Sequence, residues 1–365
     1  MSRTVSLTMN QIFETLKKHV AENDVGRIKK VTRRIKADVD EPKVIDFVAH
    51  CKISHICYRR FVLMGFLYRD TTYILVPQIS SNFLEDLGLS LMSESAIIQG
   101  AGMLAIANDF LPLSKGVQSL NIIENCLGND SSDIIEFLFS QISELFVQYS
   151  IFKIDENRFP LQYKEDYDRL YALSIPSDDY ISVSVKDCLN KLLLLQGSRS
   201  IAASIYNSIE SPQLEYSYLQ LYQCMEYLFV VKSGLSLATQ FSISTENAID
   251  IASSGKLKST ELDNLITVLK CTPEYVIDVF YNSIRTNSLD DNTDKINAVA
   301  SYIYKIRCSV AHLRFNQPQL LATVHWDTLI ENLALIIQTT YQKLDTEIIE
   351  ICSLKESWEK ITWQY

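Results

Sequence analysis

Residues 302–315 read YIYKIRCSVAHLRF, and the interpretation of the whole chain begins with this stretch. Apolar residues recur here and just upstream at helical spacing, which predicts a helix over 295–313 with one buried face. That face is formed by Val299, Tyr302, Ile303, Ile306 and Val310. Arg307 and His312 lie towards the end of the predicted helix, with four residues between them. The helix therefore carries a permanent cation close to a side chain that titrates near neutral pH.

The charge around this helix differs from the charge of the whole chain. The 365 residues include 34 Lys and Arg against 44 Asp and Glu, a formal net charge of −10. Residues 295–326, in contrast, contain no Asp or Glu. The basic residues and histidines in this acid-free window are Lys295, Lys305, Arg307, His312, Arg314 and His325. A locally basic segment in an acidic chain predicts a site for an anionic ligand.

The pair Arg307 and His312 offers a specific chemistry for such a ligand. An arginine can hold phosphate oxygens through two parallel hydrogen bonds, and a histidine can transfer a proton near neutral pH. Together they suffice for metal-free cleavage of RNA, in which the 2′-hydroxyl attacks its own phosphate. Five residues correspond to a rotation of about 140° around a helix, so one helix cannot easily aim both groups at one point. We therefore expect a homodimer in which two copies build the site.

The composition indicates a mainly α protein. The chain has only 10 Gly and 8 Pro, too few for the many turns of a β-sandwich. Helical periodicity predicts an all-α bundle in residues 186–365, after a mixed segment that marks a domain boundary. The helices predicted in this bundle cover 187–208, 212–232, 246–255, 260–285, 295–313 and 326–353. Residues 1–185 are predicted to form a separate N-terminal α+β domain.

Three features stand out in this N-terminal domain. Residues 53–77, rich in β-branched and aromatic side chains, predict a hairpin with a turn near 69–72. Residues 133–149, DIIEFLFSQISELFVQY, have helical periodicity. A run of basic residues is predicted to lie on a helix. It forms either a solvated face of that helix or a contact to nucleic acid or to an acidic partner. This run comprises Arg27, Lys29, Lys30, Arg33, Arg34 and Lys36.

Residues 187–353 resemble a HEPN domain, and YKIRCSVAHLRF resembles its signature R-x4-6-H helix. The upstream segment LYQCMEYLF resembles the HEPN helix that often carries an inward-facing glutamate, which is Glu226 here. Many members of that family are metal-independent endoribonucleases that act as homodimers, often as toxins or abortive-infection effectors in phage defence. The resemblance implies that Arg307 binds the scissile phosphate, that His312 transfers protons, and that Glu226 orients one of them. It implies no metal and no cofactor. Further contacts to RNA are expected from Lys305, Ser309 and Arg314.

One residue departs from the HEPN pattern. The position after the arginine is commonly Asn, Asp or His in that family, and here it is Cys308. A thiol is a poor hydrogen-bond partner, so either Ser309 compensates or the activity is reduced. The alternatives are therefore a catalytically inactive HEPN-like module that binds a nucleotide or a protein partner, and a purely structural helical scaffold. Glu226 has its own alternative, as a carboxylate that reaches solvent from the edge of an apolar stripe.

The remaining sequence features concern metal and phosphate-loop motifs and the cellular location of the protein. The spacing in HCKISHIC (50–57) matches no common zinc pattern, and Gln99-Gly100-Ala101-Gly102 has too few glycines for a phosphate loop. The N-terminus has no apolar signal-peptide core, and the strongly apolar stretch near 61–68 is too short to span a membrane. We expect a cytoplasmic protein with no membrane contact. The N-terminal domain is expected to sense a phage-derived or protein trigger, to hold the nuclease inactive, or to bind RNA.

Overall fold

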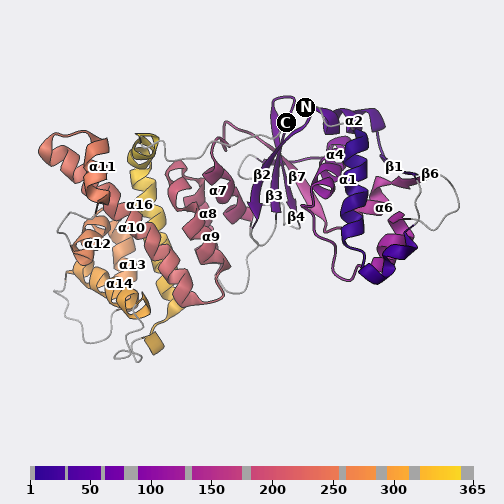
Figure 1. Cartoon of the computed structure of the whole chain (residues 1–365). Helices are drawn as coiled ribbons and strands as arrows, with labels where there is room; N and C mark the ends of the chain where they lie inside the picture. The colour runs from indigo at the N-terminus through magenta and orange to yellow at the C-terminus, as the bar shows by residue number, and fades with distance from the viewer. Residues whose placement is uncertain are drawn as a thin grey trace. The chain divides into compact units, whose positions relative to one another are not determined.

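The computed structural model describes residues 5–28, 32–58, 62–77, 89–127, 134–174, 182–254, 260–284, 294–311 and 321–354. They form two compact units, the first ending at Gln162 and the second beginning at Tyr163 (Figure 1). Among the described residues, all strands belong to the first unit and the second is entirely helical. The prediction of a mainly helical chain with a small N-terminal sheet region is thus confirmed.

The described strands of the first unit form two sheets. The larger sheet has five strands in the order β2-β3-β4-β7-β5, with antiparallel neighbours throughout. These strands are β2 (Lys52–Tyr58), β3 (Val62–Tyr68), β4 (Thr71–Pro77), β5 (Leu89–Leu91) and β7 (Tyr149–Ile154). The smaller sheet pairs β1 (Thr32–Lys36) with β6 (Ile134–Leu138) in parallel.

The predicted hairpin is confirmed and is the centre of the larger sheet. Strands β3 and β4 pair up to Tyr68 and Thr71, which leaves a two-residue turn. Both turn residues, Arg69 and Asp70, have positive φ angles of 48° and 57°. This is the left-handed geometry of a type I′ turn, whose twist matches that of the flanking strands. Strand β2 extends the hairpin to a three-stranded meander.

Helices cover one face of the larger sheet. Phe47 on α2 (Glu41–His50) packs its ring against those of Phe66, Tyr68 and Tyr73 on β3 and β4. Next to α2 lies α4 (Ser95–Ala107), which also contacts α1 (Val5–Lys18). The remaining short helices are η1 (Glu22–Arg27), α5 (Ser119–Ile122), η2 (Ile123–Leu127) and α6 (Phe139–Ser143).

The segment Gln99-Gly100-Ala101-Gly102 lies inside α4 and is a close-packing feature. A Cβ atom on Gly102 would collide with Tyr149 Oη, and one on Gly100 would meet Phe47 Cδ1 at 2.6 Å. Two side chains thus approach the helix backbone at these positions, and any larger residue would displace them. The glycines are explained by packing between α4 and its neighbours.

Two helix predictions in the first unit are wrong. Arg33, Arg34 and Lys36 of the basic run lie on strand β1, Arg27 ends the 3₁₀ helix η1, and Lys29 and Lys30 lie outside the described residues. For the segment 133–149, the described part, residues 134–149, forms β6 and α6 and enters β7. Pairing of β1 with β6 places buried Ile35 and Phe137 in the core, so tertiary contacts outweigh the local pattern.

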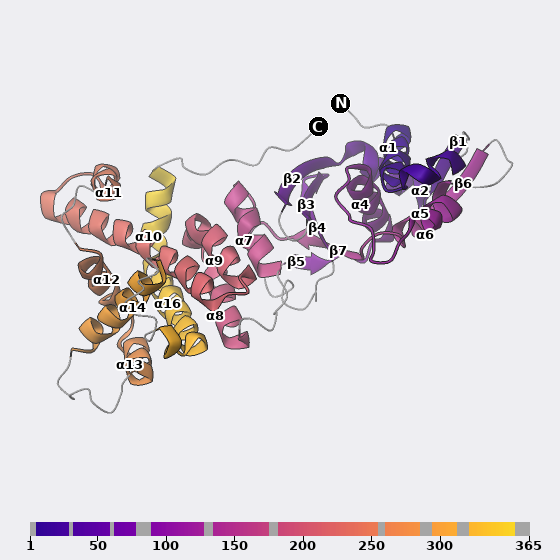
Figure 2. The same cartoon turned by 60° about the horizontal axis from the view of Figure 1, so that its bottom comes forward.

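The second unit is arranged around one long helix, α10 (Leu214–Phe241). It packs against α9, α11, α12, α14 and α16, as Figure 2 shows from another side. The other helices are α7 (Lys164–Ser174), α8 (Val183–Leu194), the 3₁₀ helix η3 (Gln196–Ile201), α9 (Ala202–Glu210), α11 (Thr245–Ser253), α12 (Glu261–Leu269), α13 (Glu274–Ile284), α14 (Lys295–Ala311) and α16 (Trp326–Leu354). No helix among the described residues is long and apolar enough to cross a membrane.

The helix predictions for this unit hold in part. The helix predicted over 326–353 is confirmed as α16, and the described part of 295–313 is confirmed as α14. The single helix predicted over 187–208 is wrong, because η3 interrupts it between α8 and α9. The single helix predicted over 260–285 is also wrong, since Pro273 separates α12 from α13 and a proline cannot continue the helical hydrogen bonds.

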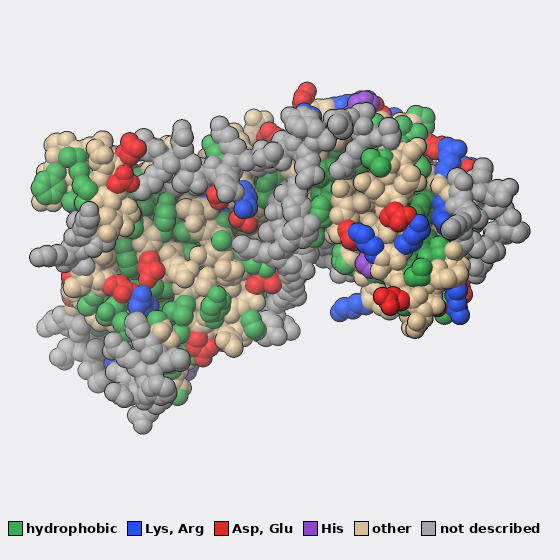
Figure 3. Space-filling view, viewed as in Figure 1, with side chains coloured by type: hydrophobic (Ala, Val, Ile, Leu, Met, Phe, Trp, Pro, Cys, Tyr) green, Lys and Arg blue, Asp and Glu red, His purple; other side chains and the backbone are tan. Residues whose placement is uncertain are grey.

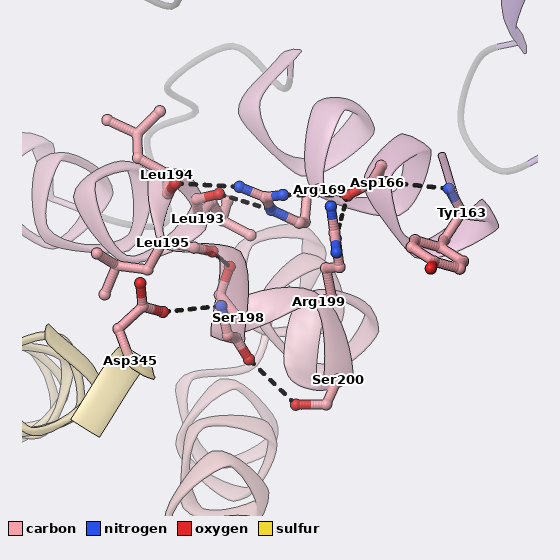
Figure 4. A network of polar contacts seen from close by, with 11 residues as sticks. Tyr163, Asp166, Arg169, Leu193, Leu194, Leu195, Ser198, Arg199, Ser200 and Asp345 are labelled. Atoms are coloured by element: carbon pink, nitrogen blue, oxygen red, sulfur yellow. Dashed lines mark hydrogen bonds and ion pairs between the residues drawn. The ribbon is translucent and has the colours of Figure 1, made fainter. Parts of the chain in front are cut away.

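A buried network of ionic contacts explains the interruption at η3 (Figure 4). Asp166 on α7 is fully buried and accepts hydrogen bonds from the guanidinium groups of Arg169 and Arg199. Arg169 also donates to the carbonyl oxygens of Leu193 and Leu194, at 2.8 and 3.1 Å. These carbonyls lie in the last turn of α8, where no helical N–H reaches them. The arginine therefore caps α8 and ends it there.

The same network sets the division between the units. Helix α7 packs against α9 and η3, so residues from Tyr163 onward belong to the helical unit. The sequence placed this boundary after residue 185. The turn after α8 is held from the other side as well, because Gly197 N–H donates to Asp345 on α16 at 2.8 Å. A Cβ atom at position 197 would lie 2.8 Å from the same carboxylate oxygen, so a glycine is needed.

Replacing Asp166 by Asn is expected to destabilise the protein by about 3–5 kcal/mol, because two buried guanidinium groups lose a shared counter-charge. Burial lowers the pKa of Arg169 to about 10, which still leaves it charged at neutral pH. The measurement is the free energy of unfolding in urea. The matched control is Asp187→Asn, which removes an exposed ion pair with Lys191 and is expected to change little. Equal effects of the two substitutions would contradict the assignment.

Candidate anion site at Arg307

Arg307 extends from α14 towards carboxylates on two other helices. Its Nη2 lies 3.3 Å from Oε1 of Glu226 on α10, and its Nε lies 3.0 Å from Oε1 of Glu261 on α12. The Arg307 side chain is 22% exposed, so the guanidinium is accessible from solvent but mostly surrounded. Three helices far apart in the sequence thus meet at one guanidinium group.

Tyr222 packs its ring against the guanidinium group of Arg307. Its ring lies under the guanidinium of Arg307, with 5.7 Å between Cζ and the ring centroid, within range of a cation–π interaction. Its hydroxyl donates to Oε1 of Glu261 at 2.8 Å. A single carboxylate oxygen of Glu261 therefore binds both the tyrosine and the arginine. We refer to Arg307, Glu226, Glu261 and Tyr222 as the Arg307 cluster.

The charges in the cluster shift the ionisation of its members. Partial burial lowers the pKa of Arg307, but the charges of Glu261 and Glu226 outweigh it and the net shift is upward. Burial and the hydrogen bond to Glu261 raise the pKa of Tyr222, so its hydroxyl stays protonated as a donor. The cluster contains one guanidinium and two glutamate side chains, a formal charge of −1.

Buried contacts hold α14 in the place that this cluster requires. The hydroxyl of Tyr218 on α10 donates to the carbonyl oxygen of Ile303 on α14 at 2.7 Å. Burial raises the pKa of Tyr218 well above its ordinary value, which keeps this donor protonated. The ring of Trp326, at the start of α16, packs edge-on against Tyr218. Arg307 therefore projects from a helix that is fixed to α10 one turn earlier.

The structure brings together only part of the predicted site. Glu226 contacts Arg307, and its side chain is 39% exposed, which places it at the edge of the apolar stripe. Lys305 is exposed. Ser309 is buried, and its hydroxyl donates to the carbonyl oxygen of Lys305 at 2.8 Å. Cys308 is also buried. His312 and Arg314 lie outside the described residues.

Glu261 and Tyr222 were not predicted as site residues. Tyr222 lies in the segment LYQCMEYLF, four residues before Glu226. Glu261 is the first residue of α12 and follows Thr260, whose side chain exchanges hydrogen bonds with Asp263 in a capping box. That motif predicts where α12 begins, but only the packing of α12 against α10 and α14 brings Glu261 to Arg307.

In the part of the acid-free window that the structure describes, carboxylates from other helices offset two of the cations. Lys295 lies 2.5 Å from Asp278 on α13, and Arg307 contacts two glutamates, so both cations are compensated from other helices. On the face shown in Figure 3, Lys and Arg side chains lie beside Asp and Glu side chains. Among the described residues, no three His, Cys, Asp or Glu side chains gather as metal ligands would.

Replacing Tyr222 by Phe is expected to lower the free energy of unfolding by about 1–2 kcal/mol, because the hydroxyl donates to an ionised carboxylate while the ring packing is kept. Urea titration followed by circular dichroism measures this change. The matched control is Tyr216→Phe on the same helix, where the side chain is exposed. A loss at position 216 as large as that at position 222 would rule out a role for the hydroxyl of Tyr222.

Comparison with known proteins identifies no relative of this chain. No protein-family model matches the chain, and no curated protein or solved structure matches it.

Proposed function

We propose that this protein is a metal-independent endoribonuclease of the HEPN type. It acts in the cytoplasm as a toxin or abortive-infection effector in prokaryotic defence against phage. The observation that carries the proposal is the contact between Arg307 of the R-x4-H segment and Glu226 of the upstream helix, at 3.3 Å. The HEPN resemblance implies a glutamate that orients either the arginine or the histidine, and the contact favours the arginine.

The roles of the residues follow from their chemistry. Arg307 binds the scissile phosphate and stabilises the charge that develops on it. His312 removes the proton from the 2′-hydroxyl or donates one to the leaving oxygen. Glu226 holds the guanidinium in place, while Lys305 and Arg314 contact the RNA. The predicted contact from Ser309 is not proposed, because this residue is buried. Attack by the 2′-hydroxyl leaves a 2′,3′-cyclic phosphate on one product and a 5′-hydroxyl on the other.

A homodimer through the helical unit supplies the second half of the site. If the predicted helix continues to His312, about 140° of rotation separates this residue from Arg307, so a second copy brings a histidine and an arginine to one phosphate. The first unit regulates this site in response to a phage-derived or protein trigger. Neither cofactor nor metal takes part in the proposed reaction.

The second candidate is a catalytically inactive HEPN-like module that binds a nucleotide or a protein partner. Two observations favour it. Arg307 is already compensated by two carboxylates, which weakens its attraction for phosphate. Cys308 is buried, and the hydroxyl of Ser309, which would compensate for it, is bonded to its own helix. Cys308→Asn distinguishes the candidates, because a gain of RNA cleavage would mark the natural protein as a degenerate binder.

His312→Ala is expected to reduce RNA cleavage by about 10²–10⁴, the usual contribution of a general acid or base. The assay uses purified full-length protein, an end-labelled single-stranded RNA and EDTA, and it identifies the cyclic phosphate on the products. Arg307→Lys should also reduce cleavage, because an ammonium group cannot make the two parallel bonds of a guanidinium.

The matched control for the histidine is His325→Ala, which changes an exposed histidine of the same acid-free window. An RNA with 2′-deoxyribose at the cleaved position should resist the wild-type protein. Equal cleavage by wild type and His312→Ala would refute the nuclease proposal, and so would cleavage of the deoxy-substituted position.

A further inference from the structure

The Arg307 cluster contains more negative than positive charge before any ligand arrives. Nε and Nη2 of Arg307 form one edge of the guanidinium plane, and this edge faces Glu261 and Glu226. Nη1 makes no hydrogen bond with any residue that the structure describes. A phosphate would therefore approach the end of the guanidinium that carries Nη1, with both carboxylates on the neighbouring edge. Each carboxylate repels that phosphate.

Glu261 is the better fixed of the two carboxylates. It lies closer to the guanidinium, at 3.0 Å against 3.3 Å, and its side chain is less exposed, at 27% against 39%. The same oxygen also accepts the hydroxyl of Tyr222, whose side chain is buried. Water screens the charge of Glu226 more and its side chain is freer to turn away. The charge that an incoming anion meets is therefore mainly that of Glu261.

We propose that Glu261 is a specificity-determining residue, which makes the Arg307 cluster select a singly charged phosphodiester over a multiply charged phosphate chain. This inference rests on the proposed function, in which Arg307 binds a phosphate of RNA. Repulsion by a fixed charge grows with the charge of the ligand, so Glu261 weakens binding of a polyphosphate more than binding of one backbone phosphate. Glu261 thus excludes free nucleotides and polyphosphates from a site that the backbone of RNA can enter.

The test measures binding of two probes by wild type and Glu261→Gln at low ionic strength, where charges are screened least. One probe is a fluorescent single-stranded oligodeoxynucleotide, which has no 2′-hydroxyl and stays intact. The other is inorganic tripolyphosphate, added as competitor. The glutamine keeps an oxygen that accepts from Tyr222 and Arg307 but removes the charge. For a phosphate bound about 6 Å from the carboxylate of Glu261, removing the charge should tighten binding of the oligonucleotide at least about threefold. The affinity for tripolyphosphate should increase more.

Two control variants separate charge from structure. Glu261→Asp keeps the charge at this position and should select between the probes much as wild type does. Glu246→Gln removes an exposed carboxylate in the first turn of α11 and should change neither affinity. Unchanged affinities in Glu261→Gln, or equal gains for both probes, would overturn the inference.

Arg307→Gln tells this failure apart from a failure of the proposed function. If Arg307→Gln binds the oligonucleotide as tightly as wild type does, Arg307 is not the phosphate site and both proposals fall. If Arg307→Gln loses binding while Glu261→Gln behaves like wild type, only the role of Glu261 is wrong.

Discussion

The helical unit depends on the contacts of one buried carboxylate, that of Asp166. Removing a carboxylate and two guanidinium groups from water is costly, so such a group persists only where its hydrogen bonds are satisfied. Asp166 accepts from Arg169, Arg199 and the backbone N–H of Tyr163. Because Arg169 caps α8 and Arg199 lies on η3, this one carboxylate fixes α7 against the break between α8 and α9. Helix α9 in turn packs on α10, which contributes Glu226 and Tyr222 to the candidate site.

The Arg307 cluster also combines carboxylates with guanidinium groups, but the carboxylates outnumber the arginines and the side chains are more exposed to solvent. Around Asp166, one carboxylate pairs with two arginines at side-chain exposures of 0–5%. Around Arg307, two carboxylates face one arginine at exposures of 22–39%. Water can reach the second cluster, and a phosphate can compete there with the carboxylates. Exposure therefore separates the structural arginines, Arg169 and Arg199, from an arginine that is available to a ligand.

The parts of the fold that could be predicted are those in which a local pattern and the packing agree. The stripes of α14 and α16 and the turn at Arg69–Asp70 satisfy their own periodicity or turn geometry. Strand β1 and the break at η3 could not be predicted, because β6 and Arg169 supply the deciding contacts from far along the chain. The candidate site divides in the same way. Arg307 and Glu226 are recognisable in short motifs, whereas Glu261 reaches the site only through helix packing.

The acid-free window shows why local charge along a chain is an incomplete guide to a ligand. Thirty-two residues without an acid suggest a positive site, yet packing brings Asp278 to Lys295 and two glutamates to Arg307. A cation that is compensated in advance loses affinity for every anion, but it loses most for the most highly charged ones. Such a site gains discrimination at the expense of affinity. The chain has a net charge of −10, but the charges that affect a ligand at Arg307 are those of the two carboxylates that α10 and α12 place beside its guanidinium.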